Sequence, residues 1–265
     1  MSIYQEFLNH AIGLARQAGA FALGAQRGAL TIESKTNEFD LVTHVDQHNE
    51  EFIKNAVADR FPTHGFLGEE SGGTIDATEV RWIVDPIDGT LNYAHGLPIW
   101  CISIGIEVAG VIEAGVIYDP SREELFSVIR GEGAHRNGER MAVSAMTDPA
   151  RSMYVTGFPY DISLDPYGDI PRFERFLRRG LIVRRLGSAA LDLAYVSCGR
   201  FDAFFEGGLS AWDTAAGALM VREAGGTTTH FDGSAYSVYK KSIIASNTVQ
   251  HGFLEEVVRG EFFRM

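Results

Sequence analysis

The segment Trp82-Ile83-Val84-Asp85-Pro86-Ile87-Asp88-Gly89-Thr90 carries two carboxylates, three positions apart, directly after an apolar run. The apolar residues predict the end of a buried strand. Because Pro86 has a fixed φ and no N–H, we expect the chain to leave the sheet there and to hold Asp85 and Asp88 on one tight turn. The N–H groups of the two following residues would then point outward beside these acids. Such a turn can bind hard cations together with a phosphate, or its aspartates can simply accept local hydrogen bonds.

Three other segments carry acids for which a structural and a functional role are both open. In Gly68-Glu69-Glu70-Ser71 the two acids are adjacent, so only one of them can face Asp85, and the segment could equally be a solvated turn. Asp213 stands at the start of an apolar helix of small residues, where it would also complement the helix dipole. The pattern Thr43-x-x-Asp46 resembles a capping box, which stabilises a helix and can hold a functional acid rigidly.

The chain has the composition of an ordinary globular protein with a substantial core, since its 265 residues are 45% hydrophobic and 22% charged. Its apolar stretches are too short for a membrane span, and its N-terminus lacks a basic region followed by an apolar core. We therefore expect a cytoplasmic protein that does not enter a membrane. The net charge of −12 argues against a nucleic-acid partner. The two cysteines, Cys101 and Cys198, have no metal-binding spacing and are expected to be small buried hydrophobes.

The order of predicted elements divides the chain into two parts. Helical periodicity over 3–22 and 43–60 precedes a stretch over 99–143 that alternates and turns repeatedly, which is typical of an antiparallel meander. Beyond that stretch, strands alternate with helices. We therefore predict an α+β domain over residues 1–146 and an α/β domain over residues 147–265.

Two further features have open roles. The segment 157–168 is rich in turn formers and is either a substrate-facing loop or an exposed connection. Arg184 and Arg185 could reach a substrate or a second phosphate, and they could equally lie on the surface or in a dimer interface. The sequence alone does not separate these alternatives.

Three segments together closely resemble the inositol monophosphatase family, whose members are magnesium-dependent, lithium-sensitive phosphatases. They are Gly68-Glu69-Glu70-Ser71, Asp85-Pro86-Ile87-Asp88-Gly89-Thr90 and Trp212-Asp213. The resemblance covers nearly the whole chain, through Leu41-Val42-Thr43 with Asp46-Gln47 and through Gly187-Ser188-Ala189-Ala190 with Phe205-Glu206. The motif D-P-I-D-G-T with a later W-D is highly specific for this superfamily and much less specific for the substrate. It implies a layered α/β/α/β/α sandwich of the sugar-phosphatase type.

The resemblance also implies a magnesium site. In the family, the residues that match Glu69, Asp85, Asp88 and Asp213 are metal ligands, and the residue that matches Ile87 ligates through its backbone carbonyl. Ligation by oxygen atoms alone is what Mg²⁺ prefers. Two ions would be held with Asp85 between them, and a third, weaker ion near Glu69 is described for relatives. Most of these ligands come from the first predicted domain, and Asp213 comes from the second.

Further residues match family positions that act on the substrate. Thr90, paired with Asp46 and near Glu69, matches the water-activating group, so these three residues are expected to be catalytic. Glu206 matches an acid that contacts sugar hydroxyls, and its structural alternative is an exposed glutamate at the end of a strand. The other expected substrate-binding residues are Asp88, Gly89, Thr90, Gly187 and Ala189.

These observations predict Mg²⁺-dependent hydrolysis of a small phosphate monoester by a metal-activated water, with inositol 1-phosphate, which yields inositol and phosphate, as the first candidate. Histidinol phosphate, fructose 1,6-bisphosphate and 3′-phosphoadenosine 5′-phosphate are alternative substrates on related scaffolds. A regulatory, protein-binding role on the same fold is an alternative of another class, although such a role does not require four convergent acids. The family's tendency to dimerise predicts a homodimer.

Overall fold

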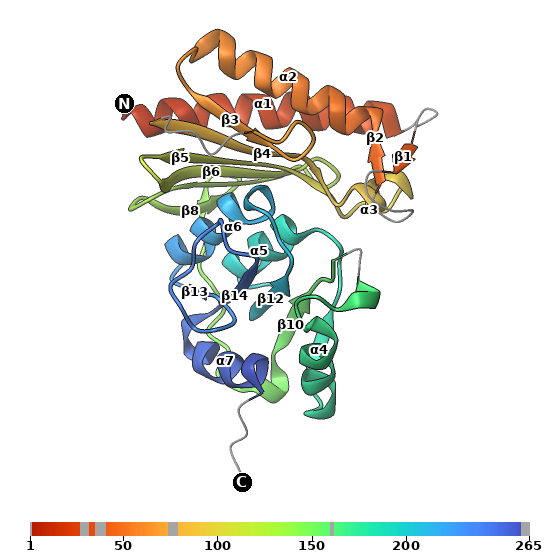
Figure 1. Ribbon diagram of the computed structural model, residues 1–265. Coiled ribbons are helices and arrows are strands. Elements are labelled where there is room, and N and C mark those ends of the chain that lie inside the picture. Colours follow the sequence, from red (N-terminus) through yellow and green to blue (C-terminus); the bar gives the residue numbers. More distant parts are fainter. Residues whose placement is uncertain (1, 27–31, 35–40, 74–78, 160–161, 261–265) are drawn as a thin grey trace.

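The computed structural model describes residues 2–26, 32–34, 41–73, 79–159 and 162–260. These residues form two sheets and their covering helices, arranged in layers (Figure 1). A separate pair of short antiparallel strands, β1 (Ile32–Ser34) and β2 (Leu41–Thr43), precedes the second helix.

Two long helices form the first layer. The predicted helix over 3–22 is confirmed and continues further, as α1 (Ile3–Gln26). The helix α2 (His44–Arg60) begins directly after Thr43, whose Oγ1 accepts a hydrogen bond from the N–H of Val45. Asp46 completes the predicted capping box at this helix start. Both helices pack their apolar sides against one face of the larger sheet (Figure 1).

The larger sheet has seven strands in the order β3-β4-β5-β6-β7-β8-β9. Strands β3 and β4 are parallel, and all later neighbours are antiparallel, so the predicted meander over 99–143 is confirmed. At the turn Asn137-Gly138 both residues have positive φ, 50° and 84°, as a type I′ turn requires. The strands are β3 (Gly65–Gly68), β4 (Val80–Asp88), β5 (Cys101–Val108), β6 (Val111–Asp119), β7 (Glu124–Ile129), β8 (Gly133–Arg136) and β9 (Glu139–Arg140).

The prediction that the chain leaves the sheet at Pro86 was wrong. Strand β4 continues through Pro86 to Asp88, with a register shift between Asp85, which pairs with Ser103, and Asp88, which pairs with Cys101. Two residues of β4 therefore lie opposite one residue of β5, which is a bulge. A bulge leaves a residue outside the hydrogen-bond ladder, so the missing N–H of proline is tolerated there. The acids consequently stand on a strand end rather than on a turn, and the short helix α3 (Thr90–Ala94) follows.

The smaller sheet is mixed rather than purely parallel. Its order is β11-β10-β12-β14-β13; β10 pairs in parallel with β11 and β12, whereas β14 is antiparallel to β12 and β13. The strands are β10 (Met153–Thr156), β11 (Ile182–Arg184), β12 (Ala203–Gly207), β13 (Thr227–Thr229) and β14 (Ser242–Ser246). Short 3-10 turns occur at Pro149–Arg151, Ile162–Leu164 and Thr248–Gln250.

Helices α5 (Ala189–Ser197) and α6 (Ala211–Glu223) fill the layer between the two sheets, and α4 (Asp169–Arg178) and α7 (His251–Arg259) cover the outer face of the smaller sheet (Figure 1). The predicted α/β/α/β/α sandwich is therefore confirmed. Three hydrophobic clusters fill the four interfaces between sheets and helices, because the middle cluster extends to both sides of α5 and α6. The middle cluster joins both predicted domains, because Leu191 and Leu219 share it with Ile117 and Phe126. The boundary at residue 146 stays a prediction.

Helix α6 fits closely between its neighbours because glycines face it. A Cβ atom on Gly105 would lie 2.6 Å from the Cβ of Ala215, and one on Gly115 would lie 2.9 Å from the Cα of Ala216. The helix has its own glycine, Gly217, where a Cβ would lie 2.5 Å from the Cβ of Leu193 on α5. These positions fix α6, and with it the acid in its first turn.

Within the described ranges, we found no helix that combines the length and the apolar character needed to cross a membrane.

Candidate active site

A cavity of about 540 Å³ lies where the ends of several elements meet. It is bordered by the end of β4 and the start of α3, by the starts of α5 and α6, and by the end of β12. The segment 157–159 also lines it, so this part of the predicted open loop faces the cavity. Tyr160, in the same turn-rich segment, lies outside the described residues.

Three acids that line this cavity lie close together. Carboxylate oxygens of Asp85, Asp88 and Asp213 all lie within 4.8 Å of one another. Strand β4 supplies the first two, and the first turn of α6 supplies the third, which also accepts the N–H of Ser210 at 2.6 Å. Asp213 therefore has both a structural role at the start of α6 and a place in the acid cluster, which the sequence had left as alternatives.

Burial disfavours the charged forms of these acids. It raises the pKa of Asp85 well above its ordinary value, and the nearby charges of Glu69, Asp88 and Asp213 raise it further. Burial likewise raises the pKa of Asp213, and it raises that of Asp88 to about 6. Several carboxylates this close together can all be ionised only if cations compensate them. The donor set is all oxygen and therefore suits Mg²⁺.

Asp88 is held by the start of α5. Its Oδ2 accepts hydrogen bonds from Ser188 Oγ at 2.6 Å and from the N–H of Ala190 at 2.7 Å, while the N–H of Ala189 donates to Oδ1 at 3.3 Å. Hydrogen bonds to the charged form lower the pKa of Asp88 against the larger effect of burial. Sequence analysis did not assign a role to Ser188, because it stands 100 residues from the acid that it contacts.

Thr90 and Asp46 are in direct contact, as the pairing in the sequence analysis requires. The Thr90 hydroxyl lies 2.9 Å from Asp46 Oδ1 and 3.0 Å from the carbonyl oxygen of Ile87, and it donates to these acceptors. The other carboxylate oxygen of Asp46 accepts the N–H of Thr43 at 2.9 Å and its hydroxyl at 2.5 Å. Asp46 therefore fixes the orientation of the Thr90 hydroxyl, whose lone pairs remain available to a further donor. The carbonyl of Ile87 belongs to the same cluster.

Glu69, rather than Glu70, lines the cavity. The turn that carries both acids is fixed by Glu50 of α2, which is buried and accepts the N–H groups of Glu70 and Ser71, both at 2.7 Å. Gly68 makes room for this carboxylate, because a Cβ there would collide with Glu50. Sequence analysis missed Glu50, since a glutamate within an ordinary helix gives no local signal.

The remaining predicted substrate residues also line the cavity: Gly89, Gly187, Ala189 and Glu206. Glu206 is buried, so the alternative of an exposed strand-end glutamate was wrong. Burial, followed by the charges of Asp213 and Asp169, raises its pKa well above the usual value. Gly157 approaches the Glu206 carboxylate so closely that a Cβ would collide with it.

Two further lining residues were not assigned by sequence analysis. Asp192 of α5 is buried, and within the described part of the chain its Oδ1 has no hydrogen-bond partner. Arg185 is an exposed lining residue whose guanidinium lies 5.5 Å from the ring centroid of Phe158, whereas Arg184 does not line the cavity. Of this arginine pair, only Arg185 lines the cavity, and whether it contacts a substrate stays a prediction.

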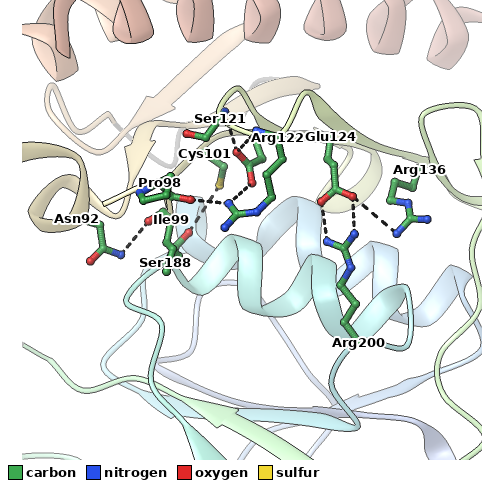
Figure 2. A network of polar contacts seen from close by, with 11 residues as sticks. Asn92, Pro98, Ile99, Cys101, Ser121, Arg122, Glu124, Arg136, Ser188 and Arg200 are labelled. Carbon is green, nitrogen blue, oxygen red and sulfur yellow. Dashed lines mark hydrogen bonds and ion pairs between the residues drawn. The ribbon is translucent and has the colours of Figure 1, made fainter. Parts of the chain in front are cut away.

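Side chains tie the rim of the cavity to the large sheet (Figure 2). Arg122 donates to the carbonyl oxygen of Pro98 at 2.5 Å, as Figure 2 shows. The side chain of Asn92 donates to the carbonyl oxygens of Ile99 and Leu186, both at 2.8 Å. Since Ile99 and Leu186 line the cavity, these contacts join two rim segments that are far apart in the sequence.

Known proteins resemble this chain over almost its full length. The model described as "Inositol monophosphatase family" matches residues 3–261. The protein named Nus factor SuhB of Pseudomonas aeruginosa is 40% identical over 250 residues, which are 92% of each chain. The solved inositol monophosphatase of Anabaena is 38% identical, with a TM-score of 0.88 and coverage of 98% of this chain and 97% of the other. The native structure of the extragenic suppressor protein suhB of Bartonella henselae is also 38% identical, with a TM-score of 0.90 and coverage of 97% and 100%.

Proposed function

This chain belongs to the inositol monophosphatase family, and from that premise we propose that it is a Mg²⁺-dependent phosphatase of inositol 1-phosphate or a closely similar small polyol phosphate. Membership of the family supports a phosphatase that acts on phosphate monoesters. The observation that carries the proposal is the group of three carboxylates within 4.8 Å of one another in the lining of the cavity.

The proposed metal ligands are the carboxylates of Glu69, Asp85, Asp88 and Asp213 and the carbonyl oxygen of Ile87, which would hold two or three ions. The donors fit, because all are oxygen atoms, and the raised pKa values of the buried acids reflect charge that a cation would compensate. When bound, Mg²⁺ would supply positive charge to the phosphate oxygens and lower the pKa of the attacking water.

The chain's own groups would orient the reactants. The Thr90 hydroxyl lies 2.9 Å from Asp46 Oδ1 and could accept a proton from the attacking water while its own proton passes to the Asp46 carboxylate. Glu69 is the expected second acid at this point. The backbone N–H groups of Gly89 and Thr90, at the start of α3, are the proposed donors to the phosphate oxygens.

Glu206, which also lines the cavity, is the proposed acceptor for hydroxyl groups of the polyol, with Gly187 and Ala189 as further lining residues. Carboxylates are strong acceptors of hydroxyl hydrogen bonds, and a buried one discriminates between substrates with and without such hydroxyls. Asp192, a second buried acid on the same wall, would extend this polar surface.

A panel of phosphate esters tests the proposal. The purified protein is assayed with inositol 1-phosphate, histidinol phosphate, fructose 1,6-bisphosphate and 3′-phosphoadenosine 5′-phosphate, each with Mg²⁺ and with EDTA. We expect turnover only with Mg²⁺ and the highest kcat/KM for inositol 1-phosphate. A higher kcat/KM for one of the other three esters would identify that ester as the better substrate. Turnover in EDTA would contradict the proposed role of Mg²⁺.

A second candidate function is suggested by the names of two relatives. The relative from Pseudomonas aeruginosa and another from Escherichia coli, 40% identical over 243 residues, are both named Nus factor SuhB. A Nus-factor role would depend on binding rather than on turnover. A strain lacking this gene is complemented with the wild type or with Asp88→Asn. Full rescue by the inactive variant would favour the binding role, and failure of rescue would favour the phosphatase.

A further inference from the structure

A second cavity, of about 280 Å³, lies along a different face of α6 from the one that carries Asp213. Four residues of α6 spaced as one helical face, from Ala215 to Arg222, form one wall. Val111 at the start of β6 and Val238 in the segment before β14 contribute apolar surface. The cavity is too small for a large ligand and is apolar on most of its wall.

Positive charge is concentrated at this cavity. Arg222 is half-buried; its Nε donates to Thr228 Oγ1 at 2.7 Å, and its guanidinium lies 5.4 Å from the ring centroid of Tyr236. In the described parts of the chain, no carboxylate lies within 4.0 Å of Arg222. A half-buried cation without an acid is unusual in a protein whose net charge is −12.

A second arginine adds to this charge. Arg130 also lines the cavity, but Glu113 lies 3.6 Å from its Nε and offsets part of its charge. Burial lowers the pKa of Arg222, Tyr236 acts against this effect, and the charge of Arg130 adds to it. The two arginines and Glu113 together leave one excess positive charge among these three side chains. One positive charge matches a monoanion better than a phosphate dianion.

The ring of Tyr236 forms another part of the cavity wall. Its phenolic oxygen is inaccessible to solvent and lies near the Thr214 side chain. The ring is therefore the part of Tyr236 that a ligand can contact. The flat guanidinium of Arg222 on the Tyr236 ring offers its remaining N–H groups in the fork geometry that a carboxylate accepts.

We propose that this cavity binds a small organic carboxylate, whose anionic group pairs with Arg222 and Arg130 and whose apolar body lies against α6, Val111 and Val238. Nothing in this inference requires the proposed phosphatase reaction. The site lies outside the cavity of the acid cluster and shares only α6 with it.

The probe is 4-fluorobenzoate, observed by ¹⁹F NMR on the full chain, with neutral 4-fluorobenzamide as the isosteric comparator. We expect saturable binding of the benzoate to the wild type and binding of the benzamide that is weaker by about tenfold or more, since it lacks the charge. Equal affinities would overturn the assignment of an anion site.

Variants locate the binding. Arg222→Gln is expected to weaken 4-fluorobenzoate binding by about tenfold or more. Arg185→Gln in the first cavity and Arg178→Gln on the exposed side of α4 are matched controls and should leave it unchanged. Val111 is exposed at the edge of the cavity, so Val111→Glu adds an opposing charge without altering the core and should also weaken binding. Unchanged binding in both Arg222→Gln and Val111→Glu, or loss in Arg185→Gln, would overturn the proposal; if Arg222→Gln does not fold, Val111→Glu decides.

Discussion

Asp88 has two sets of contacts, because its carboxylate belongs to the acid cluster and also accepts hydrogen bonds from Ser188 and Ala190. Asparagine at this position keeps the shape and one acceptor oxygen but removes the charge. We expect Asp88→Asn to lower kcat/KM by about 10²-fold or more, because each proposed ligand would support ions that stabilise the transition state by several kcal/mol. Steady-state assays in Mg²⁺ measure the loss, with Asp232→Asn at an exposed aspartate as the control. Nearly wild-type turnover would contradict the metal assignment.

Glu206 provides a test of the substrate class. Glu206→Gln keeps the shape but weakens charge-assisted hydrogen bonds, so we expect a loss of about 1–3 kcal/mol in kcat/KM for inositol 1-phosphate. A generic ester, p-nitrophenyl phosphate, has no hydroxyls at that point and should be hydrolysed almost as before. Glu51→Gln, at an exposed glutamate of α2, controls for the substitution itself. Equal losses on both esters would mean that Glu206 supports the structure of the site rather than polyol recognition.

The raised pKa values of the buried acids make the stability of the fold dependent on pH. Burial raises the folded-state pKa of Asp88 from 3.8 to about 6, and those of Asp85 and Asp213 rise as well. A raised pKa means that the folded state binds protons more tightly than the unfolded state. The resulting stability is present below the unfolded pKa and is lost as pH rises through the folded values.

We therefore expect Mg²⁺ to stabilise the protein much more at pH 8 than at pH 5, because at pH 5 protons already neutralise part of the cluster. The midpoint of thermal unfolding, measured in EDTA and in Mg²⁺ at both pH values, gives the difference. Asp85→Asn removes one of these acids and should reduce the difference between the two pH values in the stabilisation by Mg²⁺. An equal gain from Mg²⁺ at the two pH values would be incompatible with an ionising cluster at the metal site.

Individual residues differed in how well the sequence predicted them. The resemblance to the family predicted that Asp85, Asp88 and Asp213 lie together and that Thr90 pairs with Asp46, and these side chains do meet in the structure. Glu50 and Asp192 could not be found this way, because each lies within an ordinary helix and becomes part of the site only through tertiary contacts. Sequence patterns report local conformation, whereas these two positions depend on which helices face the cavity.

Among the elements, α1, α2 and the meander were predicted to within a few residues from their periodicity. Helix α4 was missed because it follows a segment rich in turn formers, although its apolar residues have a clear helical period and a proline in the first turn is compatible with a helix. The continuation of β4 beyond Pro86 was also missed, since a bulge is a property of two paired strands and not of one sequence segment.

The junction of β4 and α3 gives a prediction about stability. Gly89 has a φ of 96°, and a Cβ there would lie 2.9 Å from the carbonyl oxygen of Ile99 and 3.1 Å from that of Gly187. Gly89→Ala combines backbone strain with these collisions, and strain alone costs about 1–3 kcal/mol. Gly110→Ala has the strain alone, since φ is 81° and the surrounding space is open. Urea denaturation should show a larger loss in the free energy of unfolding for Gly89→Ala, and equal losses would rule out the collision.

At the scale of the whole molecule, the three hydrophobic layers do not divide at the predicted boundary. Side chains from both halves share the middle cluster, so the helices α5 and α6 complete the core of the seven-stranded sheet. The division into residues 1–146 and 147–265 is a proposal about how the chain is organised, and it does not imply two independent folding units. The homodimer and lithium sensitivity stay predictions from the family, to be measured by sedimentation and by inhibition assays over a range of Mg²⁺ concentrations.

Helix α6 separates the two cavities, and a shared wall has a thermodynamic consequence. Linkage requires that two ligands on one protein alter each other's affinity by the same factor. We expect 4-fluorobenzoate and Mg²⁺ each to change the other's dissociation constant by on the order of fivefold. The reason is that α6 packs closely against neighbouring glycines, so a displacement at one cavity would move the whole helix and Asp213 with it. Titrating each ligand at saturating concentrations of the other measures both factors. If the dissociation constant of each ligand does not change when the other is bound, α6 does not transmit a change from one cavity to the other.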